Sequence, residues 1–178
     1  MKIPLRIQWL LWWSSIANRS RIEKLVKITK GGDGARSILF LLPQGQITAP
    51  TVSHLIKRDI DNDFREIRYI VHENGLKYYS EQLKLNMISY TDDDLNWWGE
   101  IQSSIILDRI KTIKYDAIVN MNQKFNPTMT LLALKLEVPI KIGFESPFAE
   151  NIYTMIIQSS ETGFFEKNYE KVEQLLGL

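Results

Sequence analysis

The sequence predicts an α/β domain with a Rossmann-like, open and mostly parallel sheet, helices on both faces, and an N-terminal amphipathic helix. An unbroken apolar run at Ile38–Leu42 is typical of a strand buried on both faces. Pro43 and Gly45 end this strand, and a helical pattern follows at 47–57. Strand-like and helix-like segments alternate from there on, which predicts parallel strands joined by right-handed crossovers.

Length, composition and net charge limit which type of protein this is and which partners it can bind. The chain has 178 residues, which fits one domain, and its 44% hydrophobic and 24% charged residues are typical of a globular protein. A net charge of +1 argues against nucleic acid as a partner. There is no cysteine and only two histidines, His54 and His72, so neither a thiolate metal site nor a histidine-rich one is expected. We expect no metal and no cofactor.

The N-terminal stretch is rich in tryptophan and then in basic residues. A helix from Leu5 to about Thr29 would carry an apolar face, followed by cations. Such a composition is typical of a helix lying in a membrane interface, but tryptophans also dominate protein interfaces, so docking on the domain or on a partner protein is the alternative. The residues expected to contact the membrane or the partner are Trp9, Trp12, Trp13, Arg19, Arg21 and Lys24.

The apolar run at Ile7–Trp13 is shorter than the ~20 residues that span a bilayer, and shorter than the core of a signal peptide. We therefore expect a cytoplasmic protein, with peripheral attachment to the inner membrane as the further option. The chain divides into the N-terminal helix at 1–30, a glycine-rich joint at 31–36, and a single domain at 37–178. The joint lacks the Gly-Lys-Ser/Thr ending of a phosphate-binding P-loop.

The rest of the domain follows the same alternation. After the first strand and helix, we expect strands at 66–71, 85–90, 114–122, 138–144 and 151–157, and helices at 75–83, 100–112, 126–136 and 166–176. Asn126 is the expected N-cap of its helix, with Pro127 at the first helical position.

The loop at 91–99 contains three successive aspartates and two tryptophans. Asp92–Asp94 could hold a divalent cation, but hard cations need about six oxygens, and helix capping by Thr91 or an aspartate is the favoured interpretation. Trp97 and Trp98 could stack on a sugar, whereas packing onto the sheet is the commoner role of such a pair.

Polar residues follow two of the expected strands. Ligands of doubly wound domains bind beyond the carboxyl ends of the strands, so these residues are candidates for lining a cleft. The alternative is that they are solvated loop residues. The candidates are Gln44, Gly45, Gln46, Asn120, Asn122 and Gln123.

Three stretches carry a resemblance to a known family. Residues 38–55, 115–123 and 131–144 resemble, in order and spacing, the N-terminal half of the ADP-heptose:lipopolysaccharide heptosyltransferase family of glycosyltransferases. The likeness covers the first strand with its glycine turn and Thr-x-Pro helix, a Tyr-Asp strand, and a helix that leads into an Ile-Gly-Phe strand. It implies a glycan or a sugar nucleotide as ligand.

The chain departs from that family in two ways. The family's turn carries an aspartate after the glycine, implied to be the general base, and Gln46 stands there instead; a carboxamide cannot take a proton at neutral pH. The family's second domain, implied to bind the donor, has no counterpart in these residues. We therefore expect a non-catalytic half-glycosyltransferase-like binding or scaffold protein. The alternative is a glycosyltransferase subunit for hexosyl or heptosyl transfer in glycan or lipopolysaccharide assembly, whose donor domain is on another chain.

In that alternative another carboxylate must act as the base. Asp92–Asp94 is the better placed group, because it directly follows a strand. Asp116 precedes its strand and should lie at the far edge of the sheet.

Overall fold

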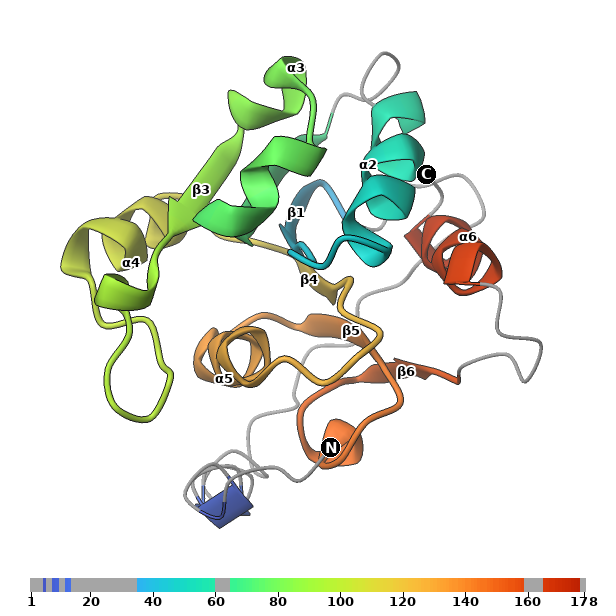
Figure 1. Cartoon of the computed structure of the whole chain (residues 1–178). Coiled ribbons are helices and arrows are strands. Elements are labelled where there is room, and N and C mark those ends of the chain that lie inside the picture. The colour runs from blue at the N-terminus through green and yellow to red at the C-terminus, as the bar shows by residue number, and fades with distance from the viewer. Residues whose placement is uncertain are drawn as a thin grey trace.

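A computed structural model describes residues 35–59, 65–158 and 165–176, together with residues 5, 8, 9, 12 and 13. The described chain forms a six-stranded parallel sheet in the order β3-β2-β1-β4-β5-β6, covered by helices on both faces (Figure 1). The strands are β1 (Ser37–Leu41), β2 (Glu66–His72), β3 (Met87–Tyr90), β4 (Ala117–Asn120), β5 (Ile140–Phe144) and β6 (Met155–Ile157). The predicted fold class is confirmed.

The strand predicted from the apolar run lies at the centre of the sheet. β1 pairs with β2 on one side and with β4 on the other, with Leu41 opposite both Ile70 and Asn120. Ile38, Leu39 and Leu41 are fully buried, as expected for a strand covered on both faces. The chain crosses from β3 to β4 on the other side of β1, so the point where the strand order reverses lies between β1 and β4.

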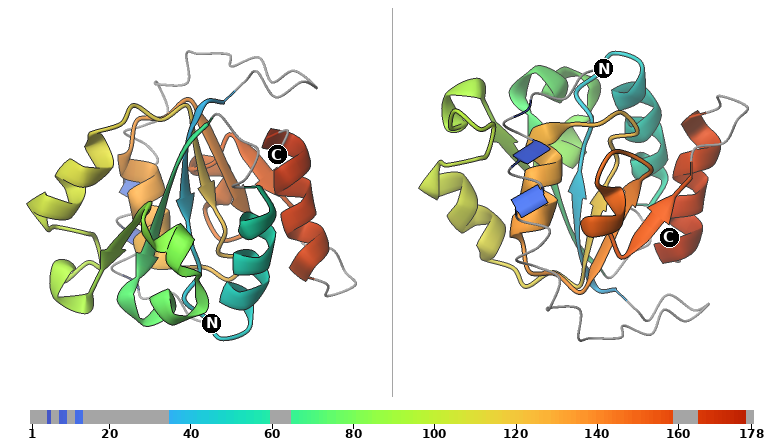
Figure 2. Two further views of the ribbon diagram at one scale, coloured as in Figure 1. Left: turned by 90° about the horizontal axis from the view of Figure 1, so that it is seen from above. Right: turned by 90° about the horizontal axis from the view of Figure 1, so that it is seen from below.

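The helices form two layers, one on each face of the sheet. Figure 2 shows α2 (Thr48–Asp59) and α6 (Phe165–Leu176) on one side, and α4 (Ser104–Lys111) and α5 (Pro127–Lys135) on the other. Successive side chains of β1 alternate between the two resulting cores, with Phe40 packed on the α2 side and Leu41 on the α5 side. The short segments are the α-helix α3 (Glu81–Lys84) and the 3-10 helices η2 (Glu73–Tyr78), η3 (Asp92–Asp94) and η4 (Ala149–Asn151).

Capping explains where one helix begins. The Asn126 side chain accepts the Met129 N–H at 3.2 Å, and Pro127 occupies the first helical position of α5, as expected.

Three elements depart clearly from the pattern that the sequence indicated, either in length or because they are divided. The helix expected at 100–112 begins at Ser104, because Leu95 and Ile101 form an antiparallel bridge instead. The intervening loop is held by the Asn96 side chain, which accepts the N–H groups of Trp98 and Glu100 at 2.9 and 3.0 Å. The helix expected at 75–83 is split into η2 and α3, and the strand expected at 151–157 is reduced to β6.

The predicted N-terminal helix is described only in part. Leu5, Gln8, Trp9, Trp12 and Trp13 are helical, while Arg19, Arg21, Lys24 and most of the glycine-rich joint lie outside the described residues. Among the helices that the structure describes, none is both long and apolar enough to cross a membrane.

Candidate functional site

The fold brings the predicted cleft residues to one edge of the sheet. Gln44, Gly45 and Gln46 form the exposed turn between β1 and α2, and Asn122 and Gln123 follow β4, the neighbouring strand. Asn120 ends β4 directly opposite Leu41, the last residue of β1. All six candidates therefore surround the point where the strand order reverses, which is where ligands bind in doubly wound sheets.

The side chains of two asparagines at this point form hydrogen bonds within the protein. Asn120 is 3% exposed; its Nδ2 donates to Tyr153 Oη at 2.7 Å, and its Oδ1 accepts the Asn122 N–H at 3.1 Å. Asn122 Nδ2 donates to Asn120 Oδ1 at 2.9 Å and to the Leu41 carbonyl at 3.1 Å. Because buried polar groups must be satisfied, these amides serve to tie the ends of β1 and β4 together.

The hydroxyl groups of two buried tyrosines form hydrogen bonds to backbone carbonyls in the same region. Tyr79 Oη donates to the Pro43 carbonyl at 2.6 Å, and Tyr169 Oη donates to the Met121 carbonyl at 3.0 Å. Burial raises the pKa of both phenols, so both remain donors at neutral pH. At Gly75 a Cβ would lie 3.0 Å from Gln44 Cα, so η2 packs directly against the turn.

The remaining predicted residues differ in their environment. Gln123 is half-buried and its Oε1 accepts Asn168 Nδ2 at 3.1 Å. The side chains of Gln44 and Gln46 are exposed, and neither makes a hydrogen bond to any part of the chain that the structure describes. These two amides can bind a hydroxyl group, but they cannot remove its proton.

Two of the aspartates considered as bases, Asp116 and Asp94, are engaged elsewhere. Asp116 Oδ2 accepts the N–H groups of Arg36 and Ser37 at 3.0 and 3.1 Å, so it lies at the far edge of the sheet, as expected. Asp94 Oδ2 accepts the Thr91 N–H and hydroxyl at 2.8 and 3.0 Å in a capping box, and these bonds hold the pKa of that carboxyl below its usual range. The capping interpretation of this loop is confirmed.

His72 has partners that the sequence analysis did not find. Its Nε2 lies 3.3 Å from Asp92 Oδ1, and its Nδ1 accepts the Asn74 N–H at 3.2 Å. The ring also meets Tyr90 edge-on, with centroids 5.0 Å apart. His72 ends β2 opposite Tyr90 of β3, so only the strand pairing reveals the contact. Both ring nitrogens are engaged, which leaves no free base, and His54 is exposed on α2.

Within the described residues, no group of three or more histidine, cysteine, aspartate or glutamate side chains could hold a metal ion.

Comparison with known proteins identifies the family. Residues 19–177 match a family of unknown function, DUF6913. The chain belongs to this family. No curated protein and no solved structure matches it. The DUF6913 match covers the whole α/β domain, and it begins at Arg19, after the N-terminal tryptophans.

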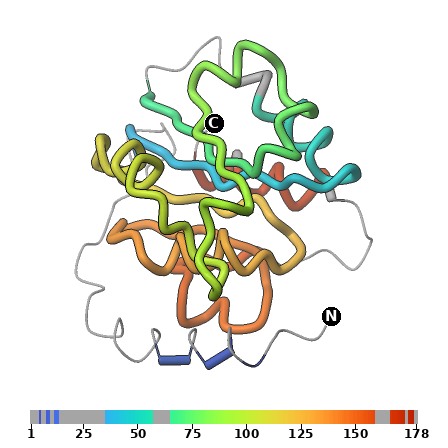
Figure 3. The backbone as a smooth tube through the Cα atoms, turned by 60° about the vertical axis from the view of Figure 1, so that its left-hand side comes forward, coloured from blue at the N-terminus to red at the C-terminus, as the bar shows by residue number. Residues whose placement is uncertain are grey.

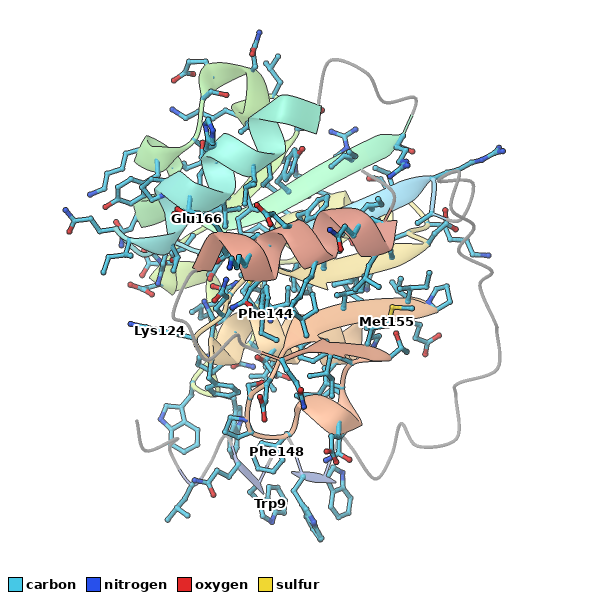
Figure 4. The ribbon with its side chains drawn as sticks, turned by 90° about the vertical axis from the view of Figure 1, so that its right-hand side faces the viewer. Trp9, Lys124, Phe144, Phe148, Met155 and Glu166 are labelled. Atoms are coloured by element: carbon cyan, nitrogen blue, oxygen red, sulfur yellow. The ribbon has the colours of Figure 1, made fainter. Side chains whose placement is uncertain are left out.

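Those tryptophans are exposed in this DUF6913 protein. Trp9, Trp12 and Trp13 are 59%, 53% and 62% exposed, and the rings of Trp9 and Trp13 stack with centroids 5.9 Å apart. The described N-terminal pieces lie at the same end of the molecule as the connection between β5 and β6 (Figure 3), and Figure 4 shows Trp9 and Phe148 at that end. Burial of these rings against the domain is therefore incomplete, and the larger part of their surface remains available.

The second pair of tryptophans is also only partly covered. Trp97 is 68% exposed, and Trp98 meets it edge-on with centroids 4.8 Å apart. The expectation that this pair packs onto the sheet is wrong for Trp97, because the Leu95–Ile101 bridge projects the loop outward.

The DUF6913 domain has an open hollow of about 890 Å³ at a different place, beside β6. Its walls come from the connection after β5 and from α6, with Phe148, Ile156 and Leu175 among the lining residues. No sequence motif indicated this hollow, because it depends on how α6 folds back against the last strand.

Proposed function

We propose that this DUF6913 protein is a non-catalytic binding or scaffold protein, a half-glycosyltransferase-like domain held at a membrane surface by its N-terminal tryptophans. The observation that carries the proposal is the amide cluster at the strand reversal. Asn120 and Asn122 use their side chains to join β1 and β4, so they are not available to a substrate.

The chemistry of the surrounding groups supports the same conclusion. Proton abstraction needs a basic group within hydrogen-bond reach of the acceptor hydroxyl. Gln46 stands on the exposed turn where the resemblance implies a base, and its amide has no basic form at neutral pH. Asp94 is engaged in a capping box, and Asp116 accepts the backbone N–H groups of Arg36 and Ser37.

The attachment to a membrane rests on exposure and charge. Tryptophan rings favour the headgroup region of a bilayer, and cations beside them add about 1 kcal/mol each near an anionic surface. More than half of each of the three N-terminal indoles is exposed, and Arg19, Arg21 and Lys24 follow them in the chain.

The attachment is tested by co-sedimentation with vesicles. Full-length protein should bind vesicles that contain an anionic phospholipid, more weakly at high salt, and the triple variant Trp9→Ala/Trp12→Ala/Trp13→Ala should not. The matched control is Trp97→Ala, which removes an exposed indole from another loop. Equal binding by the triple variant, or no binding by the wild type, would refute the membrane attachment; a stoichiometric protein complex that needs the three tryptophans would place them in a protein interface instead.

The absence of catalysis is tested separately. We expect no hydrolysis or transfer when the purified chain is incubated with ADP-, UDP- or GDP-sugars and lipid-linked acceptors, and turnover by the chain alone would refute the proposal. The second candidate, a glycosyltransferase subunit, is favoured by the unengaged Gln44 and Gln46 side chains and by the exposed Asp93 after β3. It requires a co-purifying α/β partner and transfer activity that only the complex shows.

A further inference from the structure

No strand among the described residues pairs with the outer edge of β6, the last strand of the sheet. β6 is the terminal strand, and the Glu145 N–H donates to the Ile157 carbonyl at 3.1 Å, so the backbone of Ile157 faces β5. The N–H and C=O of one strand residue point to the same side, and those of its neighbour to the other side. The backbone of Ile156 therefore points away from β5, towards the open side of the sheet.

The opposite edge is protected in a way that this one is not. On β3 the outward Met87 carbonyl accepts Arg109 Nη2 at 3.3 Å, and the other outward residue is the polar, exposed Ser89. β6 reads Met-Ile-Ile, without a charge or a proline. Natural sheets usually protect an edge with charged residues, proline or a covering element, so an apolar open edge indicates a surface that pairs with another strand.

The hollow beside β6 has the shape that an added strand requires. Ile156 and Ile157 both line it, and their side chains lie on opposite faces of the sheet. The hollow therefore runs along the edge of the sheet. Leu175 of α6 forms one wall and Phe148 the other. Lys171 Nζ closes one end by donating to the Gln158 carbonyl at 3.4 Å.

One wall is held in an unusual backbone conformation. Phe148 has φ 69°, the only positive φ among the non-glycine residues that the structure describes. A bulky residue in the left-handed region is strained, and such strain concentrates at binding sites and functional loops. Figure 4 shows Phe148 at the end of the molecule beyond β6.

The geometry points to β6 as the docking edge for an extended, basic peptide segment of a partner protein, which would add to the sheet as a seventh strand. The Ile156 N–H and C=O would bind its backbone, and its side chains would contact Phe148 and Ile156 on one face of the sheet and Leu175 on the other. This inference concerns a different site from the proposed function and stands independently of it.

Charge selects this partner over a second copy of the chain. The rim of the hollow carries the exposed carboxylates of Glu145 and Glu150, against the single ammonium of Lys171, which is held by Gln158. Two copies paired edge to edge about a two-fold axis would bring together two rims of the same net negative charge. A peptide with lysine or arginine at the outer positions would instead meet opposite charge.

Residue-level amide exchange by NMR tests the edge in the full-length protein. In the free protein the Ile156 amide should exchange fast and the Ile157 amide slowly, because only the latter faces β5. A synthetic peptide of sequence Val-Lys-Val-Thr-Val-Lys-Val should protect the Ile156 amide and shift its resonance saturably. The same peptide with glutamate in place of lysine should bind roughly tenfold more weakly at low salt.

Two sets of variants separate backbone pairing from charge. Glu145→Gln/Glu150→Gln should abolish the preference for the lysine peptide while retaining weak binding of both peptides. Ile156→Pro removes only an outward N–H, so it should prevent binding and leave the ladder to β5 intact. Ser89→Pro on the opposite edge is the matched control and should bind like the wild type.

Three results would overturn the inference. A slowly exchanging Ile156 amide in the free monomer would show that the chain's own residues already cover the edge. A dimer by light scattering that Ile156→Pro dissociates would identify a second copy as the occupant. Equal binding of the lysine and glutamate peptides, or binding of neither, would exclude a basic strand, and the wild-type measurements decide this even if a variant fails to fold.

Discussion

The substitution Gly143→Ala offers a direct test of the packing that supports the strand reversal. A Cβ added at Gly143 of β5 would lie 2.5 Å from Cε2 and Cζ of Tyr153, a distance that real Cβ contacts essentially never show. Tyr153 is 7% exposed, and its hydroxyl accepts Asn120 Nδ2 at 2.7 Å. The ring therefore has to move, and the bond to Asn120 at the end of β4 has to lengthen or break.

The magnitude follows from two contributions. Overpacking of a close-packed core costs about 1–3 kcal/mol. Loss of the Tyr153–Asn120 hydrogen bond adds about 1 kcal/mol. We expect Gly143→Ala to lower the free energy of unfolding by ~2–4 kcal/mol, which for a chain of this length lowers the Tm by on the order of 10 °C.

Urea denaturation followed by circular dichroism measures this effect. Tyr153→Phe is the control for the hydrogen bond, because it keeps the ring and removes the hydroxyl, and it should cost about 1 kcal/mol. In a Tyr153→Leu background most of the ring is gone, so Gly143→Ala should add little, and the double-mutant cycle should show strong coupling. A Gly143→Ala protein within ~0.5 kcal/mol of the wild type, or additive effects of the two substitutions, would refute this account of the packing.

Three further predictions concern the site and its surroundings. Asn122→Ala should destabilise the fold by about 1–3 kcal/mol, because the hydrogen bonds of its amide to the Leu41 carbonyl and to Asn120 Oδ1 are both lost, whereas the exposed Gln46→Ala should be nearly neutral; equal urea midpoints would contradict this. Burial lowers the pKa of Lys141 from 10.5 to about 8, so the unfolded chain binds this proton more tightly and stability should rise as the pH increases from about 8 towards 10.5; Lys141→Met should flatten that slope in pH-dependent denaturation. The neutral His72 ring should carry its proton on Nε2, because Nδ1 accepts the Asn74 N–H; a pyridine-type ¹⁵N shift at Nε2 would contradict this assignment.

The succession of strands and helices along the chain was predictable, because it depends on local sequence patterns. The apolar run at Ile38–Leu42, the proline and glycine that end it, and the Asn126–Pro127 helix start all had the expected outcome. The errors fell where long-range contacts replaced local preference. The loop held by the Asn96 side chain delayed the start of α4, and β6 kept only the residues that pair with Gly143 and its neighbours.

The position of the candidate residues was predictable from the sequence, but the partners of their side chains were not. Residues that follow parallel strands must gather at one edge of the sheet, so Gln46 and Asn122 were correctly brought together. Whether an amide is free or engaged depends on what packs against it. Tyr153 lies 33 residues from Asn120 and Asp92 lies 20 residues from His72, and neither contact has a signature in the local sequence.

The sequence by itself determined the α/β class of this DUF6913 protein, the central strand, and the amide side chain of Gln46 in the turn after it, because these depend on residue type and short-range periodicity. Only the tertiary structure decided that Asn120 and Asn122 are bound by their own protein, that Trp97 projects outward, and that the outer edge of β6, beside a hollow, pairs with no strand that the structure describes. Those properties arise from the partners that the fold brings close, and such partners are distant in the chain.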